Sequence, residues 1–346
     1  MLRPIAAVIA AVLLVGPLLV AELGVRALIK SGRLPEAPSS DQEADVSLAN
    51  VEWFGRPDVM VMGTSSIRSA LRPSTLEQLI GEATGEAVTV RTVAQRALSL
   101  EGHQILGRGL AAKGLLPNLV ILGLTPSTMT GYGATGDWFS QSELGRLWTG
   151  CAELQGRAAL SCALTQRSAL WRWRGHAARV RQALAGDVPR TAGPADRRLT
   201  TSGWLSERPV RNYTLEQRVP QLLEVLPEGV PLPQANLDSF AALISELRGH
   251  GARVIAVALP YAPQLEAALV ARNPAWYAER DAGYAALSDA ADLPIIVVDA
   301  YGEWWETRSQ NDLRHLSRRG AGPMTRQLWE MPAFREPIIE ALGSGD

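Results

Sequence analysis

Five short apolar runs recur along the chain, and each is typical of a strand that is buried on both faces of a parallel sheet. They are rich in β-branched residues and lie at residues 59–62, 87–93, 118–124, 253–259 and 294–299. Helical patterns lie between several of these runs, at residues 75–82, 100–113 and 237–250. Alternating strands and helices predict a doubly wound α/β domain, which we expect over residues 51–340.

The alternation stops over residues 126–234, where no run of this strand type occurs. An interruption of this length must carry its own structure, and we expect a mostly helical insertion that forms a cap or lid. Within it, apolar residues recur at helical spacing from Leu170 to Leu184, with arginines at other positions. This pattern predicts an amphipathic helix packed on the main domain with a solvated basic face. Contact of its basic face with anionic lipid or a membrane partner is the alternative.

The N-terminal residues 4–21 are uncharged and almost wholly apolar. Eighteen helical residues are just long enough to cross the hydrocarbon core of a bilayer. A cleaved signal peptide is the alternative, although Leu19 stands where a small residue is needed before a cleavage site at Glu22. We therefore expect residues 1–30 to form an uncleaved transmembrane anchor and the polar residues 31–50 to form a linker.

Charge and cysteine content narrow the function classes. The 34 basic and 35 acidic residues give a net charge of −1, so no basic footprint indicates nucleic-acid binding. No cluster of cysteine and histidine has the spacing of a zinc site, and neither a metal nor another cofactor is expected. The two cysteines, Cys151 and Cys162, are either a small-loop disulfide in an oxidising compartment or two buried free thiols.

The candidate chemistry begins at Gly63-Thr64-Ser65-Ser66, directly after the first predicted strand and before a helix expected over residues 67–80, with Pro73 as an irregularity. Open α/β sheets bind ligands at the carboxyl ends of their strands, and helix N-termini stabilise negative charge. Far downstream, Asp312 and His315 supply an acid and a base three positions apart. A serine nucleophile needs such a pair.

Each of these residues also has a purely structural interpretation. Ser65 and Ser66 could cap the helix that follows them, and Ser66 is also an alternative nucleophile. Asp312 and His315 could form a pair on the surface. Their joint occurrence at the ends of a five-strand pattern favours a Ser-His-Asp site.

These stretches resemble the sequence blocks of the SGNH (GDSL-like) hydrolase superfamily. The similarity is carried by Gly63-Thr64-Ser65, residues 119–124, the strand ending in Pro260 and Asp312-x-x-His315, and it covers roughly residues 51–126 and 235–330. It is nearest to a membrane-anchored, acyltransferase-like branch, similar to proteins that help D-alanylate teichoic acids and, more loosely, to those that O-acetylate exopolysaccharides. The fold implied is a flavodoxin-like three-layer α/β/α arrangement around a five-stranded parallel sheet.

The resemblance also implies three oxyanion donors: the N–H of the nucleophile Ser65, a glycine N–H after the second strand and an asparagine after the third. Here Ala97 stands at the glycine position, which still offers an N–H. Thr125-Pro126-Ser127 follows the third strand without an asparagine, so Thr125 and Ser127 are the candidate donors there. Loss of one such donor typically lowers the rate by about 10²–10³.

The function implied by the resemblance is that of a cell-envelope serine acyltransferase or esterase. His315 would take the proton of Ser65 while Asp312 holds the imidazole, and an acyl-serine intermediate would pass to a sugar hydroxyl or to water. The substrates would be O-acyl groups of a polysaccharide or a lipid-linked sugar, with an integral-membrane acyltransferase as partner and the folded domain on the periplasmic side. The alternative is a non-catalytic SGNH-like scaffold that binds a glycan or such a membrane partner.

Overall fold

A five-stranded sheet in the order β2-β1-β3-β6-β7 forms the centre of the computed structural model, and all neighbouring strands in it are parallel. The model describes residues 2–38, 42–130, 139, 142–151, 155–186, 197–209 and 212–343. The strands are β1 (Val59–Gly63), β2 (Val90–Ala94), β3 (Leu119–Leu124), β6 (Arg253–Ala258) and β7 (Ile295–Val297). Each coincides with one of the five predicted runs, so the predicted parallel sheet is confirmed.

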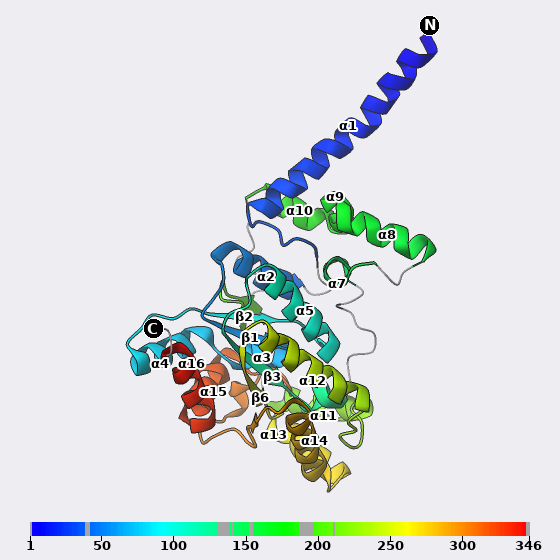
Figure 1. Cartoon of the computed structure of the whole chain (residues 1–346). Helices are drawn as coiled ribbons and strands as arrows, with labels where there is room; N and C mark the ends of the chain where they lie inside the picture. Colours follow the sequence, from blue (N-terminus) through cyan, green and yellow to red (C-terminus); the bar gives the residue numbers. More distant parts are fainter. Residues whose placement is uncertain are drawn as a thin grey trace.

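Helices cover both faces of this sheet, because alternate side chains of each buried strand point to opposite sides. Met60 and Met62 face a core built with α2 (Gln42–Phe54), α5 (Leu100–Ala112), α12 (Gln234–Gly249), α13 (Pro263–Arg272) and α14 (Trp276–Ala291). Val59 and Val61 face a second core built with α3 (Ser65–Ala70), α4 (Pro73–Thr84), α15 (Arg318–Glu330) and α16 (Pro332–Gly343). The result is a three-layer α/β/α architecture (Figure 1).

The helix expected over residues 67–80 is two helices, α3 and α4. Pro73 is the first residue of α4, and Arg72 before it is extended, with φ −87° and ψ 108°. A residue that precedes proline is driven out of the helical region by the proline ring, which explains the break. The short α3 therefore carries only the segment that follows the first strand.

The insertion over residues 126–234 is mostly helical within its described part. It contains α6 (Pro126–Thr130), α7 (Glu143–Thr149), α8 (Gly156–Arg167), α9 (Ala169–Trp173), α10 (Ala177–Leu184) and α11 (Asn212–Val225). It also contains an unexpected antiparallel pair, β4 (Arg197–Leu199) with β5 (Leu205–Glu207), whose three-residue strands are too short to give a sequence pattern. The Thr92 N–H donates to Ser202 O at 2.7 Å, so the turn of this hairpin covers the edge of β2.

The amphipathic helix expected from Leu170 to Leu184 is corrected in two respects. It is two helices, α9 and α10, and its apolar side packs on the end of α1 (Leu2–Lys30), where Val25 and Leu28 are buried. Its arginines are not one solvated face, since the buried Arg172 donates to Glu36 O and Thr165 O. An apolar stripe indicates that a helix is covered on one side, but it does not identify the covering element.

The N-terminal helix α1 extends away from the rest of the protein, with α9 and α10 beside its C-terminal end (Figure 1). Much of the expected anchor, residues 4–12 and 14, has side chains outside the described residues. Among the side chains that are described, no helix is long and apolar enough to cross a membrane. The linker expected over residues 31–50 is wrong for residues 42–50, which lie in α2. Val46 and Leu48 of this helix are buried on the body of the protein, although the acidic Glu43 and Asp45 lie in its first turn.

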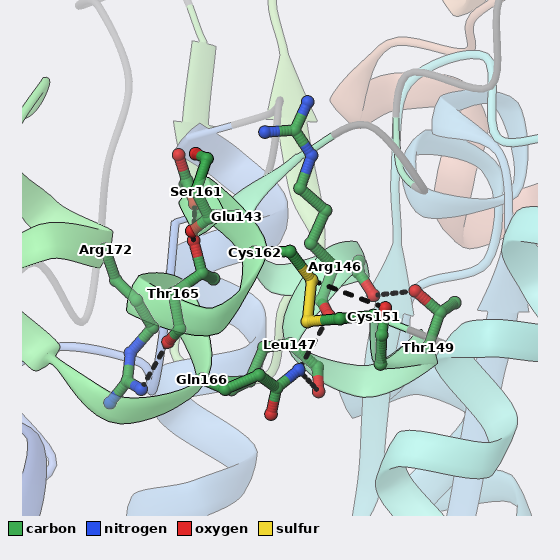
Figure 2. The surroundings of a disulfide bond; sticks show 12 residues. Glu143, Arg146, Leu147, Thr149, Cys151, Ser161, Cys162, Thr165, Gln166 and Arg172 are labelled. Carbon is green, nitrogen blue, oxygen red and sulfur yellow. Dashed lines mark hydrogen bonds between the residues drawn. A yellow bond between two sulfur atoms is a disulfide. The ribbon is translucent and has the colours of Figure 1, made fainter. Parts of the chain in front are cut away.

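Cys151 and Cys162 form a disulfide, which resolves the alternative left open by the sequence (Figure 2). The bond connects Cys151, which follows α7, to Cys162 in α8. Beside it, the Gln166 side chain donates to the carbonyl oxygens of Arg146 and Leu147, both at 2.9 Å. Helices α7 and α8 are therefore held together by covalent and hydrogen-bonded links.

Candidate active site

Ser65 lies at the carboxyl end of β1, next to the centre of the sheet. The strand ends at Gly63, whose φ of 148° suits glycine. A Cβ on Gly63 would lie 2.6 Å from Ile67 Cγ2 and 2.8 Å from Gly123 O, so no side chain fits there. The sharp turn from strand to helix therefore presents Ser65 as the first residue of α3. This is the predicted edge of the sheet.

A histidine 250 positions downstream meets this serine. The distance from His315 Nε2 to Ser65 Oγ is 2.8 Å, and the distance from His315 Nδ1 to Asp312 Oδ2 is also 2.8 Å. The predicted geometry of the three side chains is confirmed. Because Nδ1 faces a carboxylate, the tautomer that this arrangement favours carries its proton on Nδ1 and leaves Nε2 to accept from the serine hydroxyl.

The loop that carries the histidine (residues 310–317, the histidine loop) is fixed from inside. Gln310 pairs with Leu316 in an antiparallel bridge and is fully buried. With its amide oriented to satisfy its neighbours, Gln310 donates to the carbonyl oxygens of Asp312 and His315 and accepts from Tyr301. These bonds hold the backbone of both catalytic candidates to one buried side chain.

Asp312 is anchored by the backbone around it as well as by the imidazole. Its Oδ1 accepts the N–H groups of Arg314 at 2.7 Å and His315 at 2.8 Å. Burial raises the pKa of Asp312, but His315 and the two N–H groups outweigh burial and hold that pKa well below its ordinary range. The carboxylate is therefore charged at neutral pH.

The structural interpretations of these residues do not describe what is seen. Thr64, not Ser65, is the N-cap residue of α3, and it makes no side-chain capping bond. Asp312 and His315 are partly buried beside Ser65 rather than a free surface pair. Ser66 also lines the cavity, but His315 bonds to Ser65.

Ala97 fits the expected position of an oxyanion donor. It lines the cavity together with Ser65, and its φ of 48° is in the left-handed region that favours glycine. Its N–H makes no hydrogen bond within the described residues. The Ser65 N–H, in the first turn of α3, likewise has no acceptor within the helix.

The expectation for Thr125 is corrected. Its N–H donates to Thr128 Oγ1, and its hydroxyl bonds to Ser127 Oγ and Thr128 Oγ1, so it supports the loop and does not line the cavity. Ser127 does line the cavity, but its N–H donates to the Tyr261 hydroxyl at 3.1 Å. The Ser127 hydroxyl stays on the cavity wall and bonds to Thr125 Oγ1, and Thr128 of the same loop also lines the cavity.

The triad opens into a cavity of about 540 Å³. Its walls come from the turn between β1 and α3, the loop after β2, the helices α6, α11 and α12, the strand β5 and the histidine loop. Apart from Ala97, Leu98 and Leu100, every lining residue is polar or charged. The insertion contributes part of the wall, so it does border the site as a cap.

Several lining residues were not predicted from the sequence: Arg96, Glu207, Arg218, Asn236, Asn311 and Arg314. Arg314 lies between the two predicted residues of the histidine loop, so the motif itself could have indicated it. Glu207 and Arg218 lie in the insertion, where no local pattern connects them to the site. Within the described residues, no group of three or more histidine, cysteine or acidic side chains could hold a metal ion.

The chain matches no protein-family model, and no curated protein matches it. The resemblance to the SGNH superfamily therefore stays a prediction, carried by its short motifs.

Proposed function

We propose that the protein is a cell-envelope serine acyltransferase or esterase of the SGNH type, with a flavodoxin-like fold. It acts on O-acyl groups of a polysaccharide or a lipid-linked sugar. The observation that carries the proposal is the continuous chain of hydrogen bonds from Ser65 through His315 to Asp312. A helix cap and a surface pair have no reason to meet across 250 positions.

The chemistry proceeds in two halves. His315 Nε2 takes the proton from Ser65 Oγ as the oxygen attacks the acyl carbonyl, and Asp312 stabilises the imidazolium. The N–H groups of Ser65 and Ala97 receive the oxyanion, and His315 returns its proton to the leaving alcohol. A sugar hydroxyl or water then attacks the acyl-serine and passes its proton to His315, which gives that proton to Ser65 Oγ as the acyl–oxygen bond to the serine breaks. No cofactor is required.

The lining of the cavity favours a sugar over a long acyl chain. Asn236, Asn311 and Ser127 place amide and hydroxyl groups around the triad, while the apolar lining is limited to a few residues after β2. Such groups match the hydroxyls of a glycan, whereas a lipid chain needs a mainly apolar pocket. The few apolar residues of the lining leave room for only a small acyl group.

The N-terminal helix supports a membrane-anchored location. Leu18, Leu19, Val20 and Leu23 are exposed on α1, in a helix that stands away from the body. The Cys151–Cys162 disulfide favours an oxidising compartment, so the folded domain lies on the periplasmic side. An integral-membrane acyltransferase that delivers the acyl group is the partner that suits this location.

The test is acyl transfer by the full chain in detergent, with p-nitrophenyl acetate as donor and water or an oligosaccharide as acceptor. Ser65→Ala and His315→Ala should each lower product formation by at least about 10³. Both variants should keep the circular dichroism spectrum of the parent. Full activity in both variants would contradict the proposal.

A non-catalytic scaffold is the second candidate, and the Thr125 loop favours it, because no asparagine is there and the Thr125 N–H is already bonded. A scaffold would bind an oligosaccharide equally well in the parent and in Ser65→Ala, with no acyl-serine in either. Intact-mass measurement after incubation with the donor separates the two functions.

A further inference from the structure

Three guanidinium side chains line the cavity beside the triad. Arg96 lies in the loop after β2, Arg218 in α11 of the insertion and Arg314 in the histidine loop. These segments are far apart in the sequence and meet only at the site. Positive charge is therefore gathered at the cavity by the fold rather than by one local run of basic residues.

Two of the three guanidinium groups, those of Arg218 and Arg314, have no counter-charge in the described part of the chain. They make no ion pair and no hydrogen bond there. Two buried arginines elsewhere, Arg68 and Arg280, have the acidic partners Glu43 and Asp299. Arg314 is half-buried and Arg218 is exposed, so both guanidinium groups are available to a ligand in the cavity.

The acidic side chains of the cavity are already occupied. Asp312 is committed to His315 and to two backbone N–H groups. Glu207 is 2% exposed and has an interaction of its own. Neither carboxylate pairs with the guanidinium group of Arg218 or Arg314, so positive charge is in excess among the described residues that line the cavity.

Arg314 lines the cavity near the buried Tyr261. It lies close enough to the Tyr261 hydroxyl to oppose the rise that burial causes in the pKa of that tyrosine. That hydroxyl accepts the N–H of Ser127, which lines the cavity. The positive charge of Arg314 therefore acts on the same part of the cavity wall as Tyr261 and Ser127.

A planar guanidinium presents parallel N–H donors that match a carboxylate or a phosphate. In a partly enclosed cavity such a charge interacts more strongly than in open water. Resting on the function proposed above, we propose that the glycan substrate is anionic. A carboxylate or phosphate of the sugar binds Arg314 and Arg218, with Arg96 at the rim, and presents a hydroxyl or its ester to Ser65.

The experiment compares three acceptors with p-nitrophenyl acetate as donor: tetragalacturonate, glucose 6-phosphate and the neutral maltotetraose. We expect kcat/KM for one anionic acceptor to exceed that for maltotetraose by at least about tenfold. Arg314→Gln and Arg218→Gln should each lower this ratio by about 10–100-fold, as expected for losing a hydrogen bond to a charged group. Arg157→Gln, an exposed change on α8 outside the cavity, is the matched control and should leave the ratio unchanged.

The two anionic acceptors separate a carboxylate from a phosphate substrate. A ratio near one in the parent, or an equal loss for all three acceptors in both arginine variants, would overturn the inference. Calorimetry of the anionic acceptors with Ser65→Ala measures binding without acyl transfer. It therefore separates failure of this inference from failure of the proposed function. Binding of an anionic sugar that is lost in Ser65→Ala combined with Arg218→Gln would keep the inference even if no variant transferred an acyl group.

Discussion

Asp312 shows how one residue can fix the chemistry of another. Its two oxygens accept three N–H groups, one from the imidazole and two from the backbone of the same loop. The backbone bonds orient the carboxylate, and the oriented carboxylate sets which imidazole nitrogen carries the proton. The role of Asp312 is thus to hold His315 in the state that can accept the serine proton.

Asp312→Asn should lower acyl transfer by about 10⁴. The amide can donate to Nδ1 and so favour the tautomer in which Nε2 carries a proton and cannot accept one from Ser65. The measurement is the initial rate with p-nitrophenyl acetate. Asp238→Asn, on the exposed side of α12, is the control and should have the parent rate. If Asp312→Asn keeps more than a tenth of the activity, the assigned role is wrong.

Glu266 gives a second prediction at this scale, on stability against pH. It accepts the Tyr261 N–H and the Tyr277 hydroxyl, both at 3.0 Å, and burial raises its pKa from 4.5 to about 7. The folded protein therefore keeps a proton that the unfolded chain has lost between pH 4.5 and 7. Between these pH values the folded state binds more protons than the unfolded state. The free energy of unfolding therefore falls as pH rises through that window.

Glu266→Gln removes this titration. The variant should be more stable than the parent at pH 8, by about 1–3 kcal/mol, and the difference should disappear near pH 4.5. Urea unfolding at the two pH values measures it. An equal difference at both would show that the carboxyl does not titrate in the folded protein.

At the scale of elements, the close approach of α3 to the sheet sets the position of the nucleophile. Gly63 and Gly123 are paired across β1 and β3, and Ile67 of α3 lies over them. A Cβ on Gly123 would lie 2.3 Å from Ile67 Cβ. Helix α3 therefore packs directly on the sheet at two glycines that have no side chains. This close contact sets the position of Ser65.

Gly123→Ala should move α3 away from the sheet. We expect a loss of about 1–3 kcal/mol in stability, as for an overpacked core, together with slower reaction of Ser65 because its distance to His315 grows. Gly249→Ala, at the end of α12 with nothing within 4 Å of the new Cβ, is the control. Equal behaviour of the two variants in urea unfolding and in acyl transfer would contradict this account.

At the scale of the whole molecule, the sheet was predictable and the surroundings of the site were only partly so. Strands such as β1 and β3 are continuous apolar runs because both their faces are buried, and that composition is visible locally. The Ser65–His315–Asp312 geometry followed from motifs whose meeting depends on the fold. Three features were missed or misassigned: the packing of α9 on α1, the helical state of residues 42–50 and the helices α13–α16. Each depends on contacts between distant segments, which the sequence of one segment does not reveal. The place of Arg218 in the site was missed for the same reason.

The N-terminal helix provides a test at this scale. A variant lacking residues 2–21 keeps Val25 and Leu28, which pack under α9, and should fold and transfer acyl groups. It should also leave the membrane fraction on washing with alkaline carbonate, whereas the full chain should stay. Release of the full chain under the same wash would contradict an anchor. A variant lacking residues 2–30 loses the buried contacts and should unfold at lower urea.

The most direct test of the central claim is reaction of the full chain with a fluorophosphonate, followed by mass spectrometry of its peptides. The account predicts one adduct on Ser65, a rate at least about 10³ lower in His315→Ala, and no adduct in Ser65→Ala. An adduct on Ser66, or equal labelling of the parent and His315→Ala, would contradict the account.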